Sequence, residues 1–237
     1  MEIPQILVLA LVGVLAGWLN VMAGGGSLLT VPVMLFMGIP GPVANGTNRI
    51  AILAQNIVAV GTFRRRGFSD FRLSLSLAAA AALGALAGAS LGVHLQGEWF
   101  ARMLALVMIA VMLLRATGHD RIRPVSGDGQ VKNLLLGHVL MIGAGFWGGF
   151  IQIGVGFILM PILHRVMGLD LVRVNMHKVF IVLVFTIVAL TVFASQLELL
   201  WWTGIGLGVG NALGGWLGAH TTMSQGEGLI RRVLYVA

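Results

Sequence analysis

Apolar residues run through this chain in long stretches, interrupted only by short polar or glycine-rich links. The first stretches fall at about 4–22, 27–37, 43–63, 71–95 and 99–117. After a polar link the series repeats at about 132–151, 155–167, 172–194, 198–222 and 229 to the end. Because a helix that spans a bilayer needs roughly 20 apolar residues, this pattern predicts an all-α, polytopic transmembrane helical bundle.

The two halves of the chain align with each other. Asn45 corresponds to Asn175 at an offset of 130 positions (175 − 45 = 130). The same offset relates Phe63 to Phe193, Gly84 to Gly214, Gly88 to Gly218 and Arg102 to Arg232. Repeated halves are common in membrane transporters. We therefore expect a first repeat at 1–118, a cytoplasmic linker at 119–131 and a second repeat at 132–237, whose last segment is too short to cross and is incomplete.

The charges of equivalent loops predict how the halves are oriented. The basic residues 64–66 correspond to the uncharged residues 194–196, whereas Arg165 and Arg173 correspond to the uncharged stretch 36–43. Short cytoplasmic loops are rich in Lys and Arg, so equivalent loops of different charge are expected on opposite faces. This predicts inverted repeats of about five segments each, with the N-terminus outside and the linker inside. Parallel repeats remain the alternative, if the second segment is an arm of a re-entrant hairpin.

The composition fits a membrane protein. Of 237 residues, 58% are hydrophobic and 10% are charged, and the mean hydropathy is +0.96, whereas a soluble domain is about 25% charged. The 15 Lys and Arg against 8 Asp and Glu fit basic cytoplasmic loops better than a nucleic-acid partner. The chain has no cysteine, which excludes thiolate metal sites and cysteine nucleophiles. No motif predicts a metal, a cofactor or an enzyme's nucleophile and base.

The charged residues differ in their positions along the segments. All the acidic residues fall in links or at segment ends, whereas cation carriers usually need an acid within the membrane. Arg49 and Lys178 instead lie several residues inside their segments, where a cation costs roughly 2.5 to 3.5 kcal/mol. We expect an anion in a water-filled cavity to compensate them. The alternative is that both side chains snorkel to an interface.

Polar side chains accompany these cations at helical spacing, and two such stripes would line a cavity near the repeat axis. The alternative is that the amides join helices by hydrogen bonds. The stripes contain Asn45, Asn48, Arg49, Gln55 and Asn56 in the first half, and Asn175, Lys178 and Thr186 in the second. The substrate-binding residues expected in or beside the stripes are Asn45, Thr47, Asn48, Arg49, Asn56, Gln152, Asn175, His177 and Lys178.

Glycines also predict breaks within the membrane segments. The run Gly24, Gly25, Gly26 and Ser27 precedes a short segment with a proline, and Gly154 begins a looser copy. A helix that starts at such a break offers free N–H groups and the positive end of its dipole, and both attract anions. We add these five residues to the expected substrate site. Close helix packing is the other role of glycine here.

These motifs, in this order, resemble the TauE/SafE family of sulfite and sulfonate exporters, also called the toluenesulfonate uptake permease family. The resemblance is carried by the run at 24–27, Gly38-Ile39-Pro40, the stretch Ala44-Asn45-Gly46-Thr47-Asn48 and the basic loop after the third segment. Asn48 stands where the family typically has serine. The second-half copy at 174–178 is further from the pattern, and Val155 interrupts its glycine run.

The resemblance implies a secondary carrier of small oxyanions or organosulfur anions, such as sulfite or sulfonates. Together with the buried cations, it predicts a multi-pass carrier of the bacterial inner membrane that exports its anion by alternating access. The expected partners are this anion and the lipid bilayer, and the oligomeric state stays open. A passive anion channel, an intramembrane enzyme and a structural membrane subunit are the alternatives.

Overall fold

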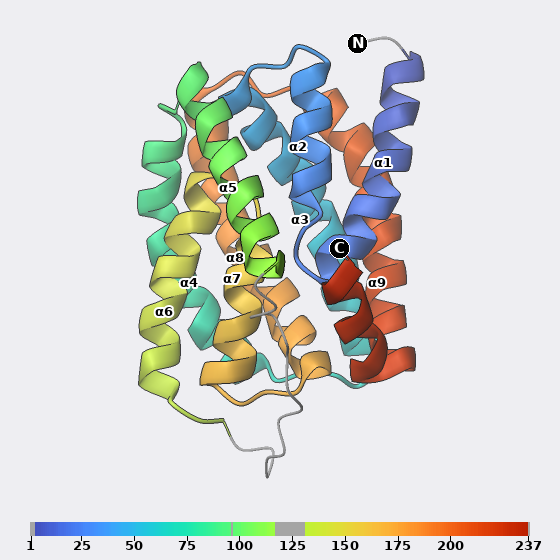
Figure 1. Ribbon diagram of the computed structural model, residues 1–237, viewed down its shortest axis with the longest axis vertical. Helices are drawn as coiled ribbons and strands as arrows, with labels where there is room; N and C mark the ends of the chain where they lie inside the picture. The colour runs from blue at the N-terminus through green and yellow to red at the C-terminus, as the bar shows by residue number, and fades with distance from the viewer. Residues whose placement is uncertain (1–2, 96, 117–130, 237) are drawn as a thin grey trace.

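A computed structural model describes residues 3–95, 97–116 and 131–236 (Figure 1). Within these ranges all regular structure is helical and no strand occurs, which confirms the all-helical prediction. Residues 119–130 of the predicted linker lie outside the described residues. The elements are α1 (Ile3–Met22), α2 (Ser27–Phe36), α3 (Gly41–Arg65), α4 (Phe71–Gly92), α5 (Glu98–Ala116), α6 (Leu134–Phe150), α7 (Val155–Pro161), the π-helical turn η1 (Ile162–Val166), α8 (Leu171–Gln196) and α9 (Trp201–Val236).

Helix ends coincide with residues that stop or cap helices. Gly38, at φ +82°, turns the chain between α2 and α3, and Pro42 sits in the first turn of α3, where its missing N–H costs nothing. The side chain of Asp70 accepts a hydrogen bond from the Leu73 N–H and caps α4. Gly226, at φ +64°, bends α9 so that its last turns form a separate arm. The ninth and tenth apolar stretches are these two parts of α9.

Helix lengths fall into two groups. The 26 residues of α8 give a length of about 39 Å, more than the roughly 30 Å of a bilayer's apolar core. Of the described helices, α4 and α8 are both long and apolar enough to cross a membrane. In contrast, the 10 residues of α2 extend only about 15 Å, half of that thickness. The short helices α2 and α7 can therefore begin in the middle of the molecule.

Glycines bring the two halves of the sequence into close contact. A Cβ atom at Gly84 of α4 would collide with the Ile142 carbonyl of α6, and one at Gly214 of α9 would collide with the Val14 carbonyl of α1. The pairs α1 with α9 and α4 with α6 are accordingly the most extensive helix contacts, followed by α3 with α9 and α4 with α8. Each half thus packs one of its helices against the first helix of the other half.

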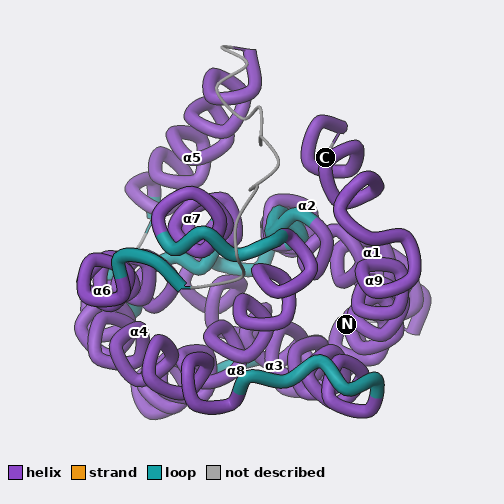
Figure 2. Tube along the Cα trace, turned by 90° about the horizontal axis from the view of Figure 1, so that it is seen from below, coloured by secondary structure: helices purple, strands orange, loops and turns teal. Residues whose placement is uncertain are grey.

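Corresponding helices of the two halves of the chain run in opposite directions (Figure 1). From the end where the N-terminus lies, α1, α3 and α9 run toward the far end, whereas α4, α6 and α8 run back. Helix α2 runs from the middle toward the N-terminal end, and α7 runs from the middle toward the far end. Seen along the helices, α4 and α6 lie on one side and α1 and α9 on the other, while α5 leans away from the bundle (Figure 2).

Basic residues gather at the far end of the molecule. This end holds the last turn of α3, the start of α4, the start of α6 and the link between η1 and α8 (Figure 1). We call it the basic end, because these segments carry Arg64, Arg65, Arg66, Arg72, Lys132, Arg165 and Arg173. Arg102, near the start of α5 at the opposite end, is paired with Glu98.

Candidate functional site

Two helix breaks meet in the middle of the bundle. The first lies between α1 and α2, where Gly24 has a φ of +84°. The second lies between α6 and α7, where Gln152 and Gly154 have φ values of +63° and +71°. A Cβ at Gly24 would collide with the backbone of Gly156, and a Cβ at Gly156 with that of Gly24. The two breaks therefore touch through glycine backbone, which brings the first turns of α2 and α7 together.

A small interior hollow adjoins this crossing. Its volume of about 10 Å³ is close to the minimum that holds one water molecule. Of the expected site residues, it brings together Gly24, Ser27, Asn56, Gln152 and Lys178. The remaining lining residues are Asn20, Gln55, Val155, Gly156, Val179 and Val182.

Arg49 is buried beside the C-terminal end of α6. Its Nη1 donates to the Gly148 carbonyl at 2.9 Å and to Gln152 Oε1 at 2.6 Å, and its Nη2 donates to the Gly149 carbonyl at 2.5 Å. The guanidinium carbon lies 4.5 Å from the centre of the Phe193 ring. With 0% of its surface exposed, Arg49 does not snorkel to an interface.

Lys178 is held in a similar way at the C-terminal end of α1. Its Nζ donates to the Val21 carbonyl at 2.7 Å and to Asn175 Oδ1 at 2.8 Å, and lies 3.8 Å from Met160 Sδ. Unlike Arg49, it lines the hollow directly. Its exposed fraction of 2% also excludes a position at an interface.

Each buried cation is thus bound by carbonyl groups at the end of the other half's first helix. The negative end of a helix dipole stabilises a nearby cation, so α6 and α1 offset part of the two charges. None of the ion pairs among the described residues includes Arg49 or Lys178. The backbone therefore supplies part of the charge compensation that we expected from an anion. The residues that line the hollow include no carboxylate.

The asparagines that correspond in the two halves both join helices. Asn45 Nδ2 donates to the Phe150 carbonyl at 3.0 Å, so this side chain and Arg49 bind the same end of α6. Asn175 Nδ2 donates to Thr222 Oγ1 of α9 at 3.3 Å. Neither amide lines the hollow.

Asn48 and Thr47 tie α3 to the helices on either side of it. Asn48 Nδ2 donates to Ser27 Oγ at 3.3 Å, and its Oδ1 accepts from Thr30 Oγ1 at 2.7 Å. Thr47 Oγ1 accepts from the Leu200 N–H at 3.2 Å. Asn48 therefore positions the first turn of α2, and Thr47 positions the segment before α9.

The remaining expected residues lie near the hollow without lining it. His177 is buried against α4, where its Nδ1 lies 2.8 Å from Ser74 Oγ and its Nε2 has no partner. A Cβ at Gly26 would collide with the Ala16 carbonyl, so this glycine packs α2 against α1. Gly25 lies against the ring of Phe157, and Gly154 is the N-cap residue of α7 in the left-handed conformation.

Three polar or glycine residues of the hollow, Asn20, Gln55 and Gly156, were not among the expected substrate-binding residues. Asn20 Nδ2 donates to Gln55 Oε1 at 3.2 Å, which links α1 to α3. A signal for Asn20 exists, because it is an amide within an apolar stretch, just before the glycine run. Gln55 belongs to the predicted polar stripe, and Gly156 follows the second break.

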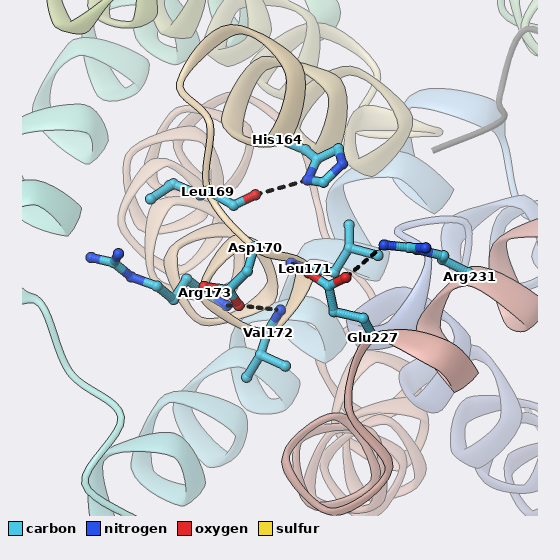
Figure 3. Close-up of polar contacts among 8 residues, drawn as sticks. All are labelled: His164, Leu169, Asp170, Leu171, Val172, Arg173, Glu227 and Arg231. Atoms are coloured by element: carbon cyan, nitrogen blue, oxygen red, sulfur yellow. Dashed lines mark hydrogen bonds and ion pairs between the residues drawn. The ribbon is translucent and has the colours of Figure 1, made fainter. Parts of the chain in front are cut away.

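Carboxylates fix the start of α8, the helix that carries Lys178 (Figure 3). Asp170 Oδ1 accepts from the N–H groups of Val172 and Arg173 at 3.0 and 2.9 Å. Glu227 accepts from the Leu171 N–H at 3.0 Å and pairs with Arg231 at 2.6 Å. Negatively charged side chains near a helix N-terminus stabilise the helix through its dipole. These two carboxylates at the basic end thus have a structural role in positioning α8.

Comparison with known proteins gives one consistent result. The family model described as sulfite exporter TauE/SafE matches residues 9–237. Similar curated proteins include the probable membrane transporter protein ORF9 of a Sinorhizobium species, 28% identical over 94% of this chain and 85% of its own length. Another is a probable membrane transporter protein of Haemophilus influenzae, 27% identical over 99% of this chain and 91% of its own. No solved structure gives a significant match.

Proposed function

The chain belongs to the TauE/SafE sulfite exporter family of membrane transporters, and from this premise we propose that it exports sulfite or an organosulfonate across the bacterial inner membrane. It would act as a secondary carrier, since the sequence has no nucleotide-binding motif and an ion gradient or the membrane potential must then drive transport. Its substrate would bind in the central hollow.

The observation that carries this proposal is the set of positive groups around the hollow. Lys178 lines it with 2% of its surface exposed, and the first turns of α2 and α7 adjoin it. The positive end of a helix dipole favours anions. The amides of Asn20 and Asn56 add hydrogen-bonding groups, and no carboxylate is among the lining residues. This combination favours an oxyanion over a metal cation.

Alternating access between two inverted repeats fits the arrangement of helices. The corresponding pairs α1 and α6, α3 and α8, and α4 and α9 each run in opposite directions (Figure 1). Gly84 and Gly214, which correspond in sequence, each pack against the first helix of the other half. A hollow of about 10 Å³ must widen before it can hold an oxyanion. The basic end would face the cytoplasm, with the N-terminus outside.

Sulfite flux into or out of liposomes tests the proposed role of the central charge. Lys178→Gln keeps a hydrogen-bond donor but removes the charge, so we expect sulfite flux to fall at least about tenfold, the effect of roughly 1.4 kcal/mol. The matched control is Arg102→Gln, which removes a cation whose side chain is 60% exposed and lies far from the hollow. Equal flux in the wild type and both variants would remove Lys178 from the mechanism.

The same liposomes distinguish a carrier from a passive channel. A carrier gives flux that saturates with sulfite concentration, because each cycle requires a conformational change. A carrier coupled to protons also responds to an imposed pH gradient. A channel with the same lining would give flux that rises without saturation and follows only the electrochemical gradient of sulfite.

A further inference from the structure

Two corresponding phenylalanines lie on opposite sides of the hollow. Phe63 is near the end of α3, toward the basic end, and Phe193 is near the end of α8, toward the opposite end. They are 1% and 0% exposed and rank among the largest fully buried side chains. Each ring packs in a small apolar cluster. The cluster of Phe63 contains Ala59 and Ala219, and the cluster of Phe193 contains the corresponding residues Ala189 and Ala89.

The cluster around Phe63 adjoins both the hollow and a larger cavity. We call this cavity, of about 410 Å³, the vestibule. Phe63 and Met176 line the vestibule, whereas Val179 of the same cluster lines the hollow. Side chains of one apolar cluster thus line both spaces.

The vestibule belongs to the basic end of the molecule. Arg64, Ser69 and Ser74 contribute polar groups to its wall, and so does Asp70, which caps α4 and lies 3.7 Å from Arg173. The rest of its wall is apolar and consists of Val60, Phe63, Phe68, Phe71, Met176 and Phe180. An anion that enters from this end therefore meets a cation before it reaches the Phe63 cluster.

The cluster around Phe193 lies near the end of α8, away from the basic end. Its ring contacts the Arg49 guanidinium, which binds Gln152 Oε1, and Gln152 lines the hollow. Phe193 also belongs to one apolar cluster with Leu199, which lies in the link between α8 and α9. This ring is therefore connected to the hollow through Arg49.

We propose that Phe63 and Phe193 are the two gates of the hollow, and that the structure has both gates closed. Opening the Phe63 cluster would join the hollow to the vestibule, and opening the Phe193 cluster would join it to the opposite end. The inference rests on the proposed function in one respect: it takes the hollow to be the transport site. It adds the residues that alternately close this site.

Accessibility of a single cysteine tests the gates, because the natural chain has no cysteine. Val182 lines the hollow and is 6% exposed, so Val182→Cys places a small thiol there. It would be labelled in right-side-out and inside-out vesicles with a membrane-impermeant methanethiosulfonate. Added Phe63→Ala should raise the labelling rate at least about tenfold from the basic end only. Added Phe193→Ala should do the same from the opposite end only.

Phe180→Ala is the matched control, because it widens the vestibule but leaves the Phe63 cluster intact, and it should not change labelling of the hollow. If an alanine variant fails to fold, Phe63→Leu or Phe193→Leu gives a smaller increase with the same sidedness. Unchanged labelling in both gate variants, or an increase without sidedness, would overturn the proposal. The labelling needs no substrate, so it can succeed or fail independently of sulfite flux.

Discussion

At the scale of single residues, Gln152 combines a buried, hydrogen-bonded side chain with a strained backbone conformation. It is 2% exposed, accepts a hydrogen bond from Arg49 and has a φ of +63°. A non-glycine residue in this region costs about 1 to 2 kcal/mol, and such strain often marks a functional position. The position of Gln152 beside the glycine break allowed its prediction as a site residue. Its φ angle and its hydrogen bond with Arg49 depend on the tertiary structure and could not be predicted.

Substitutions at Gln152 separate strain from function. Gln152→Gly removes the strain and the side chain, whereas Gln152→Ala removes the side chain alone. We expect the glycine variant to be more stable than the alanine variant by about 1 kcal/mol and both to lose sulfite flux, because Arg49 loses its amide partner. Thermal unfolding in detergent and liposome flux measure the two effects. An alanine variant as stable as the glycine variant would contradict the strain, and full flux in both would contradict a role for the side chain.

At the scale of helices, most segment positions follow from the sequence, whereas the contacts between the helices do not. The apolar stretches predicted at 4–22, 27–37 and 132–151 match α1, α2 and α6 to within two residues, whereas the stretch at 155–167 contains both α7 and η1. The binding of Arg49 to the Gly148 carbonyl joins residues 99 positions apart, and no local pattern contains this information. For this reason, the prediction from the sequence was that an anion alone compensates the charge of Arg49, although helix ends supply part of this compensation.

Helix contact through glycine gives a sharp stability prediction. Gly84→Ala places a Cβ on the backbone of Ile142, and such overpacking typically costs about 1 to 3 kcal/mol, so the variant should unfold at a lower temperature. A Cβ at Gly143 of α6 would meet no atom within 4 Å, so Gly143→Ala is the matched control. It should be neutral or slightly stabilising, because alanine favours a helix. Equal melting temperatures in the two variants would contradict the close contact of α4 and α6.

At the scale of the whole molecule, the all-helical class and the family could be predicted from the sequence, and both are confirmed. The repeat offset of 130 positions predicts corresponding residues, and Phe63 and Phe193 do occupy corresponding clusters. The crossing of Gly24 with Gly156 could not be predicted, because it depends on how the two halves pack together. Inverted topology, orientation in the membrane and the transported anion remain predictions.

The central claim is that the hollow beside Lys178 binds a small anion. Thermal unfolding of the purified protein in detergent, with sulfite, sulfate or short sulfonates at equal ionic strength, tests it most directly. A ligand at about 100 times its Kd stabilises the folded form by about 2.7 kcal/mol, a shift on the order of 5 °C. We predict this shift for sulfite or a sulfonate in the wild type, and its loss in Lys178→Gln. No shift with any anion, or an equal shift in Lys178→Gln, would contradict the claim.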